Sequence, residues 1–306
     1  MARVIFEGAS YVLNEGESVL AALLRGGANV PYSCGKGTCH CCLMQSLDGH
    51  PGEDSQSGLR PNWVEHGMFL PCRARPAQDL TVSRPNLSGV YTQAILAERT
   101  WLSPTVCRLS FEPASNMSWL AGQFVNLRRA DGLVRSYSIA TLRDEDYFLS
   151  VDVKRIANGA MSNWLCDELE VGDELDVQGP FGDCTYDAND KHRNLLLLAT
   201  GTGLSPLVAV AREALRRGHT GRVVLYHGAR HASGLYLSES LRALCNQHEN
   251  LSVARCLTSA DPAPDVVRGR IVPRAFEELG SLRYRSFSGF CSDRVNSLPG
   301  LKKTFL

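Results

Sequence analysis

Cysteine spacing constrains this chain more than any other feature of its sequence. Cys34, Cys39 and Cys42 are separated by four and then two residues, and Cys72 follows after 29 more. The chain holds 11 cysteines in 306 residues, whereas a secreted disulfide scaffold is normally much shorter and has an even number. We therefore expect reduced thiols, four of which bind a metal.

The other cysteines are expected to have structural roles. Cys41 lies in the same loop but between the spaced positions, so we do not expect it to bind the metal. Six more are scattered singly, and a scattered cysteine is usually a small buried hydrophobic residue. These six are Cys107, Cys166, Cys184, Cys245, Cys256 and Cys291.

The spacing predicts a 2Fe-2S cluster, since four cysteines in this arrangement supply its thiolate ligands. Gly35 and Gly37 let the loop curl, so that backbone N–H groups approach the sulfur atoms and help to set the reduction potential. Zinc is the main alternative, but zinc sites usually combine one CxxC unit with a second CxxC or a histidine pair. Only one such unit is present, and His40 is interpreted as a loop residue.

Charge and hydropathy exclude several classes of protein. The 32 basic and 32 acidic side chains cancel, whereas a generic nucleic-acid binder normally shows a basic excess. The first twenty residues lack the charged start and apolar run of a signal peptide. Residues 194–211 are uncharged, but glycines and Pro206 interrupt them, which favours a buried strand, a turn and a helix start over a membrane span. We therefore expect a cytoplasmic protein, where free thiols survive.

The pattern of apolar residues changes twice along the chain, which predicts three domains. Residues 1–85 read as a small α+β domain. Residues 89–186 show short strands between glycine and proline turns, which suggests an antiparallel β-barrel. Residues 187–306 alternate strands with helices, which predicts a Rossmann-like α/β domain with a parallel sheet. The predicted helices are residues 18–25, 161–169, 207–217 and 237–245.

The cysteine loop resembles that of a known family. Its sequence, Pro31-Tyr-Ser-Cys-Gly-Lys-Gly-Thr-Cys-His-Cys-Cys-Leu43, is similar to the cluster-binding loop of plant-type ferredoxins. The resemblance implies a β-grasp fold for residues 1–85, and that fold matches the order of the predicted elements.

A second resemblance lies in the barrel-like region. Arg135-Ser136-Tyr137-Ser138 is similar to the RxYS motif of the ferredoxin–NADP reductase family, and Gly122–Leu127 resembles a Gly-Gln-Phe strand that precedes it there. In that family the arginine neutralises a flavin phosphate, the tyrosine packs on the isoalloxazine ring and the serine reaches the reactive edge of the flavin. A guanidinium binds phosphate in a bidentate way. The alternative is ordinary alternation of charged and aromatic residues on an exposed strand.

The segment Val153–Ser162 resembles the family's second flavin segment, in which Gly-x-x-Ser opens a helix beneath the pyrophosphate. Helix N-termini favour anions because their N–H groups are unpaired. The alternative is that Ser162 simply caps a helix over 163–169. The resemblance implies flavin contacts from six residues of the segment, namely Val153, Lys154, Gly159, Ala160, Met161 and Ser162.

Two further motifs resemble the nicotinamide nucleotide-binding segments of the family. Gly201-Thr-Gly-Leu-Ser-Pro206 is similar to the GTGxxP turn that follows a buried strand, where glycines allow close approach of the backbone to a ligand. The turn ending in Arg230 matches a Gly-x-Arg turn, so Arg230 is expected near the adenosine half, with an ordinary surface arginine as the alternative. The expected contacts of the first turn are Gly201, Thr202, Gly203, Ser205 and Pro206.

The C-terminal region departs from the family pattern. The family usually has a Cys-Gly-Pro-like turn near the nicotinamide after its last strand, which we expect here at 285–288. Gly289 stands at the position of that cysteine, and Cys291 comes two residues late. Cys291 is kept as a candidate nucleotide contact. Relatives often continue with an aromatic-containing tail, which leaves open whether Leu306 is the natural end.

The resemblance covers the whole chain, whose domain order is similar to that of single-chain oxygenase reductases of the benzoate dioxygenase reductase type. Members with the ferredoxin domain first typically use FAD, so the resemblance implies FAD. NADH, favoured over NADPH, would supply two electrons that FAD passes singly to the 2Fe-2S cluster, and the cofactors carry this chemistry. Tyr137, Ser138 and Thr202 are the residues expected nearest to the transfer between nicotinamide and flavin.

The expected electron acceptor is a partner oxygenase of the Rieske or di-iron type. The sequence shows no second cysteine–histidine constellation for oxygen activation, so that chemistry is assigned to another protein. Two alternatives stay open. The acceptor is a non-oxygenase such as a deoxysugar-forming enzyme, or the chain is a redox sensor in which the altered 289–291 turn prevents reduction by NAD(P)H.

Overall fold

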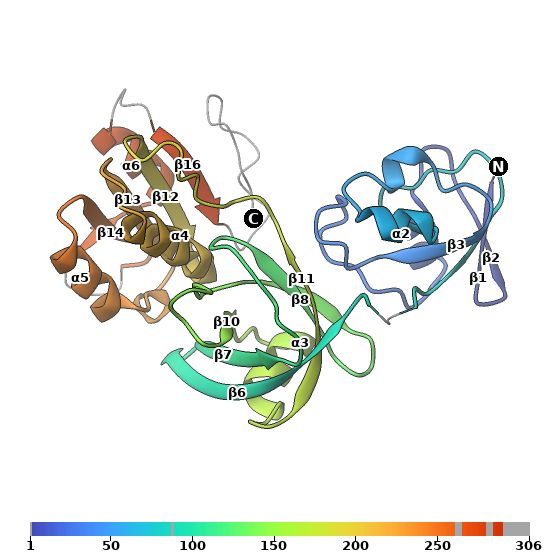
Figure 1. Cartoon of the computed structure of the whole chain (residues 1–306), viewed down its shortest axis with the longest axis horizontal. Helices are drawn as coiled ribbons and strands as arrows, with labels where there is room; N and C mark the ends of the chain where they lie inside the picture. Colours follow the sequence, from blue (N-terminus) through green and yellow to red (C-terminus); the bar gives the residue numbers. More distant parts are fainter. Residues whose placement is uncertain (1, 87–88, 261–264, 280–283, 290–306) are drawn as a thin grey trace. The chain divides into compact units, whose positions relative to one another are not determined.

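The computed structural model describes residues 2–86, 89–260, 265–279 and 284–289. These residues form three β-sheets (Figure 1), which confirms the predicted multidomain α+β and α/β fold class. They group into two compact units, one made of 1–92 with 126–136 and 176–178, the other of the remaining residues. In the part of the chain described, no helix is long and apolar enough to cross a membrane. The domain limits 1–85, 89–186 and 187–306 stay predictions.

The first sheet has the strand order β2-β1-β5-β3-β4 and carries helix α1. β1 runs antiparallel to β2 and parallel to β5, as a β-grasp fold requires. The side chain of Ser18 caps α1 by accepting a 3.2 Å hydrogen bond from the N–H of Ala21. The elements are β1 (Arg3–Phe6), β2 (Ala9–Val12), α1 (Val19–Arg25), β3 (Met44–Asp48), η1 (Glu53–Ser55), α2 (Pro61–Glu65), β4 (Met68–Phe69) and β5 (Leu80–Ser83).

The second sheet closes into the predicted antiparallel barrel. Its order is β10-β7-β6-β11-β8-β9, and the two end strands meet through an antiparallel bridge between Ile139 and Val151. The N–H of Ala140 adds a 2.8 Å hydrogen bond to the carbonyl of Ser150. The strands are β6 (Thr92–Ser103), β7 (Val106–Pro113), β8 (Phe124–Arg128), β9 (Val134–Ser138), β10 (Leu149–Lys154) and β11 (Glu174–Phe181).

The helix predicted for residues 161–169 forms differently. A short α-helix, α3 (Ala160–Asn163), continues as a π-helix, η2 (Trp164–Glu168). The N–H of Leu169 bonds to the carbonyl of Trp164 at 2.9 Å, which spans five residues rather than four. The segment still buries Leu165 and Leu169 in the barrel core, so the apolar pattern was read correctly and only the winding differs.

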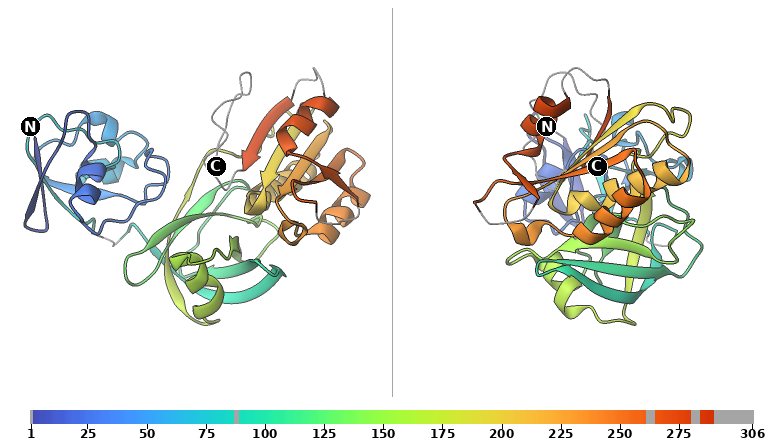
Figure 2. Two further views of the ribbon diagram at one scale, coloured as in Figure 1. Left: turned by 180° about the vertical axis from the view of Figure 1, so that it is seen from behind. Right: turned by 90° about the vertical axis from the view of Figure 1, so that its left-hand side faces the viewer.

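The third sheet is fully parallel, with helices on both faces. Alternate residues of β12 point to opposite sides, so Leu195 and Leu197 pack in a cluster with α4 and α5, while Leu196 and Leu198 pack with α6. Figure 2 shows these helices on either side of the sheet. The elements are β12 (Asn194–Thr200), η3 (Gly201–Gly203), α4 (Leu204–Arg216), β13 (Val223–Ala229), η4 (Ala232–Gly234), α5 (Ser238–Gln247), β14 (Leu251–Leu257), β15 (Val266–Arg268), α6 (Ile271–Leu279) and β16 (Tyr284–Gly289).

The strand order of the third sheet contains one reversal. The strand order is β15-β14-β13-β12-β16. Along the chain, successive strands are added outward from β12 to β15, and β16 then pairs on the other side of β12. Ligands of open parallel sheets bind beyond the carboxyl ends of the strands at such a reversal. The Gly201–Gly203 turn directly follows β12 and therefore lies there. Helix α4 begins at Leu204, earlier than predicted, because Pro206 is tolerated in the first turn of a helix.

The scattered cysteines mostly behave as predicted. Cys107, Cys166, Cys184 and Cys256 are at most 1% exposed. Cys245 is only half-buried, and Cys291 lies outside the described residues.

Gly122 offers a test of the packing between the barrel and α4. Its φ is +92°, and a Cβ there would lie 2.0 Å from the carbonyl oxygen of Cys184 and 2.9 Å from a methyl of Val210. Gly132 has a similar φ of +89° with nothing within 4 Å. We expect Gly122→Ala to cost about 1–3 kcal/mol more than Gly132→Ala because only the first also overpacks the core. Calorimetry should show a melting temperature roughly 3–10 °C lower for Gly122→Ala. Equal melting temperatures would contradict the packing.

Candidate functional site

The cysteine loop connects α1 to β3, and several of its backbone N–H groups point toward cysteine sulfur atoms. The N–H groups of Lys36 and Cys39 lie 3.3 and 3.4 Å from the Sγ of Cys34, and the N–H of Cys34 lies 3.4 Å from the Sγ of Cys39. Gly35 and Gly37 have φ of +64° and +84°, the left-handed region that a glycine adopts freely. The loop therefore curls around the sulfur atoms as the sequence predicted.

The four spaced cysteines lie in two pairs. The thiol of Cys39, followed by burial, raises the pKa of Cys34 to about 12. A hydrogen bond to the Cys72 thiol and then burial raise the pKa of Cys42. Two thiol pairs suit a cluster in which each of two irons takes two protein sulfurs. Among the described residues no three histidine, cysteine or acidic side chains are grouped to hold a single metal ion. The two pairs of thiols fit a 2Fe-2S cluster, whose binding must displace the thiol protons.

The second candidate segment lies on β9. Arg135 is exposed, whereas Ser136, Tyr137 and Ser138 are half-buried. The hydroxyl of Ser136 donates a 2.8 Å hydrogen bond to Oδ1 of Asn126. The amide of Asn126, which is fully buried, donates in turn to Oε1 of Gln178 at 2.7 Å.

Asn126 and Gln178 were missed by the sequence analysis. Asn126 interrupts the apolar run 124–127 of β8, which was the available signal, whereas β11 also carries Glu174 and Asp176 and gives no such signal for Gln178. The buried hydrogen bond between the two amides restrains Asn126, while Nε2 of Gln178 has no hydrogen-bond partner among the described residues. Asn126 and Gln178 therefore fix the hydroxyl of Ser136.

The barrel closure brings the two predicted flavin segments together. The bridge from Ile139 to Val151 is antiparallel, so residues just before Ile139 lie alongside those just after Val151. Tyr137 and Ser138 consequently lie on the same side of the bridge as Val153, which is buried.

Ser162 does not cap the helix that follows it. The helix begins one turn earlier, with Gly159 at the N-cap. The hydroxyl of Ser162 accepts a 3.2 Å hydrogen bond from the N–H of Ile156 and lies 3.4 Å from the carbonyl oxygen of Gly159. Ser162 therefore shapes the loop between β10 and α3. Lys154, the last residue of β10, and Ala160, the first residue of α3, are exposed, while Met161 is buried.

The nucleotide-type turn lies at the strand reversal and has open space beside it. Gly201 has φ of +54°, and no atom lies within 4 Å of the position that a Cβ would take. Ser205 is 2% exposed, and its hydroxyl has no hydrogen-bond partner among the described residues. A buried polar group without a partner calls for an explanation, and a polar ligand or an ordered water bound at this turn supplies one. Pro206 is buried in the first turn of α4.

Comparison with known proteins gives three adjacent family matches. The model of the 2Fe-2S iron-sulfur cluster binding domain matches residues 5–77, that of the oxidoreductase FAD-binding domain 93–186 and that of the oxidoreductase NAD-binding domain 197–290. The reductase subunit of an aromatic O-demethylase from Amycolatopsis sp. is 34% identical over 275 residues, which cover 86% of this chain and 82% of the relative. The chain belongs to the ferredoxin–NADP reductase family.

Other relatives agree with this family. The electron transfer component of toluate 1,2-dioxygenase from Pseudomonas putida is 31% identical, covering 82% of this chain and 77% of its own. The crystal structure of an Amycolatopsis cytochrome P450 reductase superposes with a TM-score of 0.65 at 30% identity, covering 94% of this chain and 90% of the other. The expected oxidoreductase with 2Fe-2S, FAD and NAD(P)H as cofactors is thereby confirmed.

For this ferredoxin–NADP reductase family member, two of the expected nucleotide contacts, Arg230 and Cys291, show no hydrogen bond or ion pair with the turn among the described residues. Arg230 is exposed at the end of β13, and its guanidinium makes no hydrogen bond or ion pair with the described residues. Its carbonyl accepts a 2.9 Å bond from the N–H of Ser259. The turn with Cys291 lies outside the described residues, beyond the end of β16 at Gly289. Both contacts stay predictions.

His227 is a residue of the nucleotide-binding region that the sequence analysis missed. It lies on β13 opposite Ala199 of β12 and is fully buried, with its ring packed edge-on against Tyr236 at 5.6 Å between centroids. Burial lowers the pKa of His227 to about 4, although the nearby backbone of Gly201 favours the protonated form. A lone histidine in an apolar strand was the signal for this site.

The cluster assignment predicts a sharp difference between neighbouring cysteines. Replacing any one of the four paired cysteines with serine should abolish the 2Fe-2S absorbance and most of the bound iron, since a thiolate ligand is lost. Cys41→Ser is the matched control because Cys41 is equally buried in the same loop. Iron analysis and visible spectra after anaerobic reconstitution would measure both. A Cys41→Ser protein without iron, or a Cys42→Ser protein with full iron, would refute the assignment.

The buried histidine predicts acid sensitivity. The pKa of His227 is about 4 in the folded protein and roughly 6.5 in the unfolded chain. Its contribution to the stability of the fold is therefore fully present above a pH of about 6.5, where the imidazole is neutral. That stabilisation is lost as the pH falls from 6.5 toward 4. Between pH 7.5 and pH 5 the loss is about 2 kcal/mol. His227→Phe should remove this part of the acid destabilisation, as measured by calorimetry at both pH values. An unchanged acid shift in the variant would show that other groups cause it.

Proposed function

We propose that this chain transfers electrons from NAD(P)H, through FAD and a 2Fe-2S cluster, to an oxygenase that acts on an aromatic compound. The observation that carries the proposal is the presence of all three cofactor-binding regions in one chain that is 34% identical to the reductase subunit of an aromatic O-demethylase. We place the ferredoxin domain at 1–85, the FAD domain at 89–186 and the NAD(P) domain at 187–306.

The proposed residue roles follow from the three sites. Cys34, Cys39, Cys42 and Cys72 hold the cluster. When bound, FAD would supply the conversion of paired electrons into single ones, a chemistry that the chain itself lacks. Tyr137 and Ser138 offer an aromatic face and a hydroxyl on β9, and Arg135 offers a guanidinium to a phosphate. The turn around Thr202, at the reversal of the third sheet, supplies backbone N–H groups and space for the nicotinamide nucleotide.

The names of the relatives favour an oxygenase as acceptor over a deoxysugar-forming enzyme or a sensing role. One of them is the aromatic O-demethylase reductase, and the similar crystal structure is that of a cytochrome P450 reductase. The toluate 1,2-dioxygenase component favours a Rieske-type acceptor instead. A cytochrome P450 thus joins the Rieske and di-iron oxygenases as a candidate partner. We propose the cytoplasm as the location because the described cysteines are all free thiols.

The test is anaerobic reduction followed by reconstitution. Addition of NADH to the reconstituted protein should bleach both the flavin peaks and the broad iron–sulfur absorbance. In the Cys42→Ser protein, NADH should bleach only the flavin peaks. In air the wild type should support cytochrome c reduction at least about tenfold faster than Cys42→Ser, since the one-electron carrier is missing in the variant. NADPH in a parallel assay decides between the two nucleotides.

The acceptor is decided by oxygenase assays. The wild type is combined with a cytochrome P450 O-demethylase and, separately, with a Rieske dioxygenase, each supplied with its aromatic substrate. Product formation with one of them identifies the class of partner. If cytochrome c is reduced and both oxygenases stay inactive, the proposed partner class is wrong.

A further inference from the structure

We infer that Arg212 of α4 is a positioning residue for electron transfer from NAD(P)H to FAD. Its ion pairs with Glu145 and Asp146 tie the helix that starts at the nucleotide-type turn to the segment that follows the flavin-type strand β9. The inference rests on the proposed function, because these are the two segments proposed to bind nucleotide and flavin.

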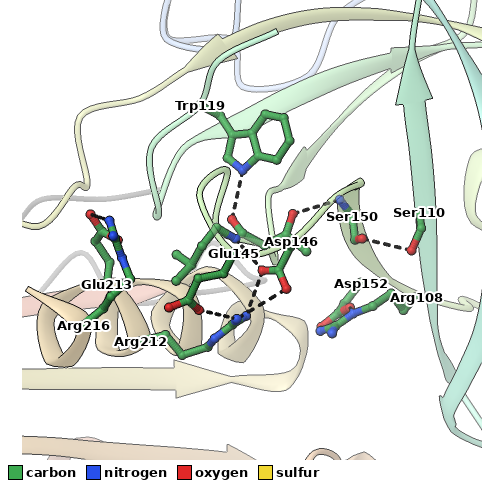
Figure 3. A network of polar contacts seen from close by, with 12 residues as sticks. Arg108, Ser110, Trp119, Glu145, Asp146, Ser150, Asp152, Arg212, Glu213 and Arg216 are labelled. Carbon is green, nitrogen blue, oxygen red and sulfur yellow. Dashed lines mark hydrogen bonds and ion pairs between the residues drawn. The ribbon is translucent and has the colours of Figure 1, made fainter. Parts of the chain in front are cut away.

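The ion pairs connect residues far apart in the sequence. One guanidinium nitrogen of Arg212 lies 3.0 Å from Oδ2 of Asp146, and the other lies 3.3 Å from Oδ1 of Asp146 and 2.8 Å from Oε2 of Glu145. Figure 3 shows both carboxylates turned toward Arg212. One turn further along α4, Arg216 lies 2.8 Å from Oδ2 of Asp144. Three consecutive acidic residues are thus bound to two arginines one turn apart.

The acidic segment is itself held in place from within the barrel. Oδ2 of Asp146 accepts a 2.7 Å hydrogen bond from the N–H of Leu142. Thr141 beside it accepts from the indole N–H of Trp119 at 3.0 Å and, through its hydroxyl, from the N–H of Ser150 at 3.1 Å. The carboxylate of Asp146 is therefore held by the barrel segment independently of Arg212, which reduces the conformational entropy that its pairing costs.

An apolar layer beneath the ion pairs sets the distance between α4 and the barrel. Leu142, Ala121 and Val106 of the barrel share one buried cluster with Leu207 and Val210 of α4. Apolar contacts are non-directional, so this layer fixes the separation but permits sliding and rotation of the helix. A bidentate guanidinium–carboxylate pair has a preferred geometry. Arg212 therefore supplies the restraint on orientation that the apolar layer lacks.

The helix transmits this restraint to the nucleotide-type turn. Arg212 lies eight residues after Leu204, or about 12 Å along a rigid helix, and Gly201–Gly203 immediately precede Leu204. The acidic segment in turn begins a few residues after Ser138, the end of β9. A shift of α4 therefore moves the turn relative to β9. A misplacement of about 1 Å between reacting groups lowers a rate by roughly 100-fold, whereas partly exposed ion pairs contribute little to stability.

The test is stopped-flow reduction of the FAD-loaded full chain by NADH without oxygen. In that reaction NADH and FAD become NAD⁺ and FADH⁻, so two electrons and one proton leave the nicotinamide together. We expect Arg212→Gln to lower the limiting rate of flavin reduction about 10- to 100-fold, with a much smaller change in the NADH dissociation constant and in FAD content. Arg212→Lys should recover only part of the rate, since lysine is not bidentate.

Arg217→Gln is the matched control. Arg217 stands at the end of the same helix and carries the same charge, but its ion pair is with Glu213 of α4 itself. In the Arg217→Gln protein, NADH should reduce the flavin at the wild-type rate. The inference is overturned if Arg212→Gln reduces at the wild-type rate, if Arg217→Gln is slowed equally, or if only NADH affinity changes.

Asp146→Asn covers the case in which Arg212→Gln does not hold FAD, and a wild-type limiting rate in Asp146→Asn then overturns the inference. Asp146→Asn removes the same ion pair from the barrel side, and it should lower the limiting rate without loss of FAD. Where Arg212→Gln does hold FAD, the double variant should be no slower than the slower single variant, because both changes break the ion pair between Arg212 and Asp146. Additive slowing overturns the inference. Failure of the wild type to be reduced by either NADH or NADPH would refute the proposed function itself, which separates the two outcomes.

Discussion

The burial of helix α4 on two surfaces at once is the constraint on which the second unit depends. One face of the helix packs on the parallel sheet through Leu195 and Leu197, and the same apolar cluster continues into the barrel through Ala121 and Leu142. Gly122 leaves no room for a side chain between Cys184 and Val210. A single continuous core of this kind fixes the separation of the barrel, the helix and the sheet because interiors pack densely. The strand reversal and the closure of the barrel are therefore held in one body.

Within that body the polar groups have a different task from the apolar ones. Burial of apolar side chains supplies the free energy that holds α4 against the barrel, but it does not specify the orientation of the helix. The ion pairs and hydrogen bonds of Figure 3 specify that orientation. The ion pair between Arg108 and the buried Asp152 joins the neighbouring barrel strands β7 and β10 at 2.7 Å. The flavin-type residues 135–138 thus lie on a strand, and the nucleotide-type turn directly joins a strand to a helix. Such placement is what transfer between two bound cofactors requires.

The fold was predictable from the sequence where the signals are local. Ser18 followed by a periodic apolar run predicted α1, and the uniformly apolar stretch before Gly201 predicted the central strand β12. The short helix α2 and the strand β15 were not predicted, because elements of five and three residues have little intrinsic stability and form only through tertiary contacts. The π-helix η2 was equally invisible, since a helical apolar pattern does not distinguish the two windings.

The candidate site divides in the same way. Spacing predicted the four cluster cysteines, and short motifs predicted the segments on β9, β10 and after β12. Asn126 and His227 escaped because their importance comes from burial, which a single sequence does not display. The pairing of Arg212 with Glu145 joins residues 67 positions apart, and opposite charges are too common in sequence for any one pair to be singled out.

The strand order has a consequence for how the chain folds during synthesis. The first sheet is complete once Ser83 has been made, since all of its strands precede that residue. The third sheet waits much longer, because β12 pairs along one edge with β16, which ends at Gly289. Until then the apolar strand Leu195–Leu198 presents an open edge, the kind of surface that recruits other chains. A ribosome stalled late on this message would thus carry a finished ferredoxin fold joined to an aggregation-prone half-sheet.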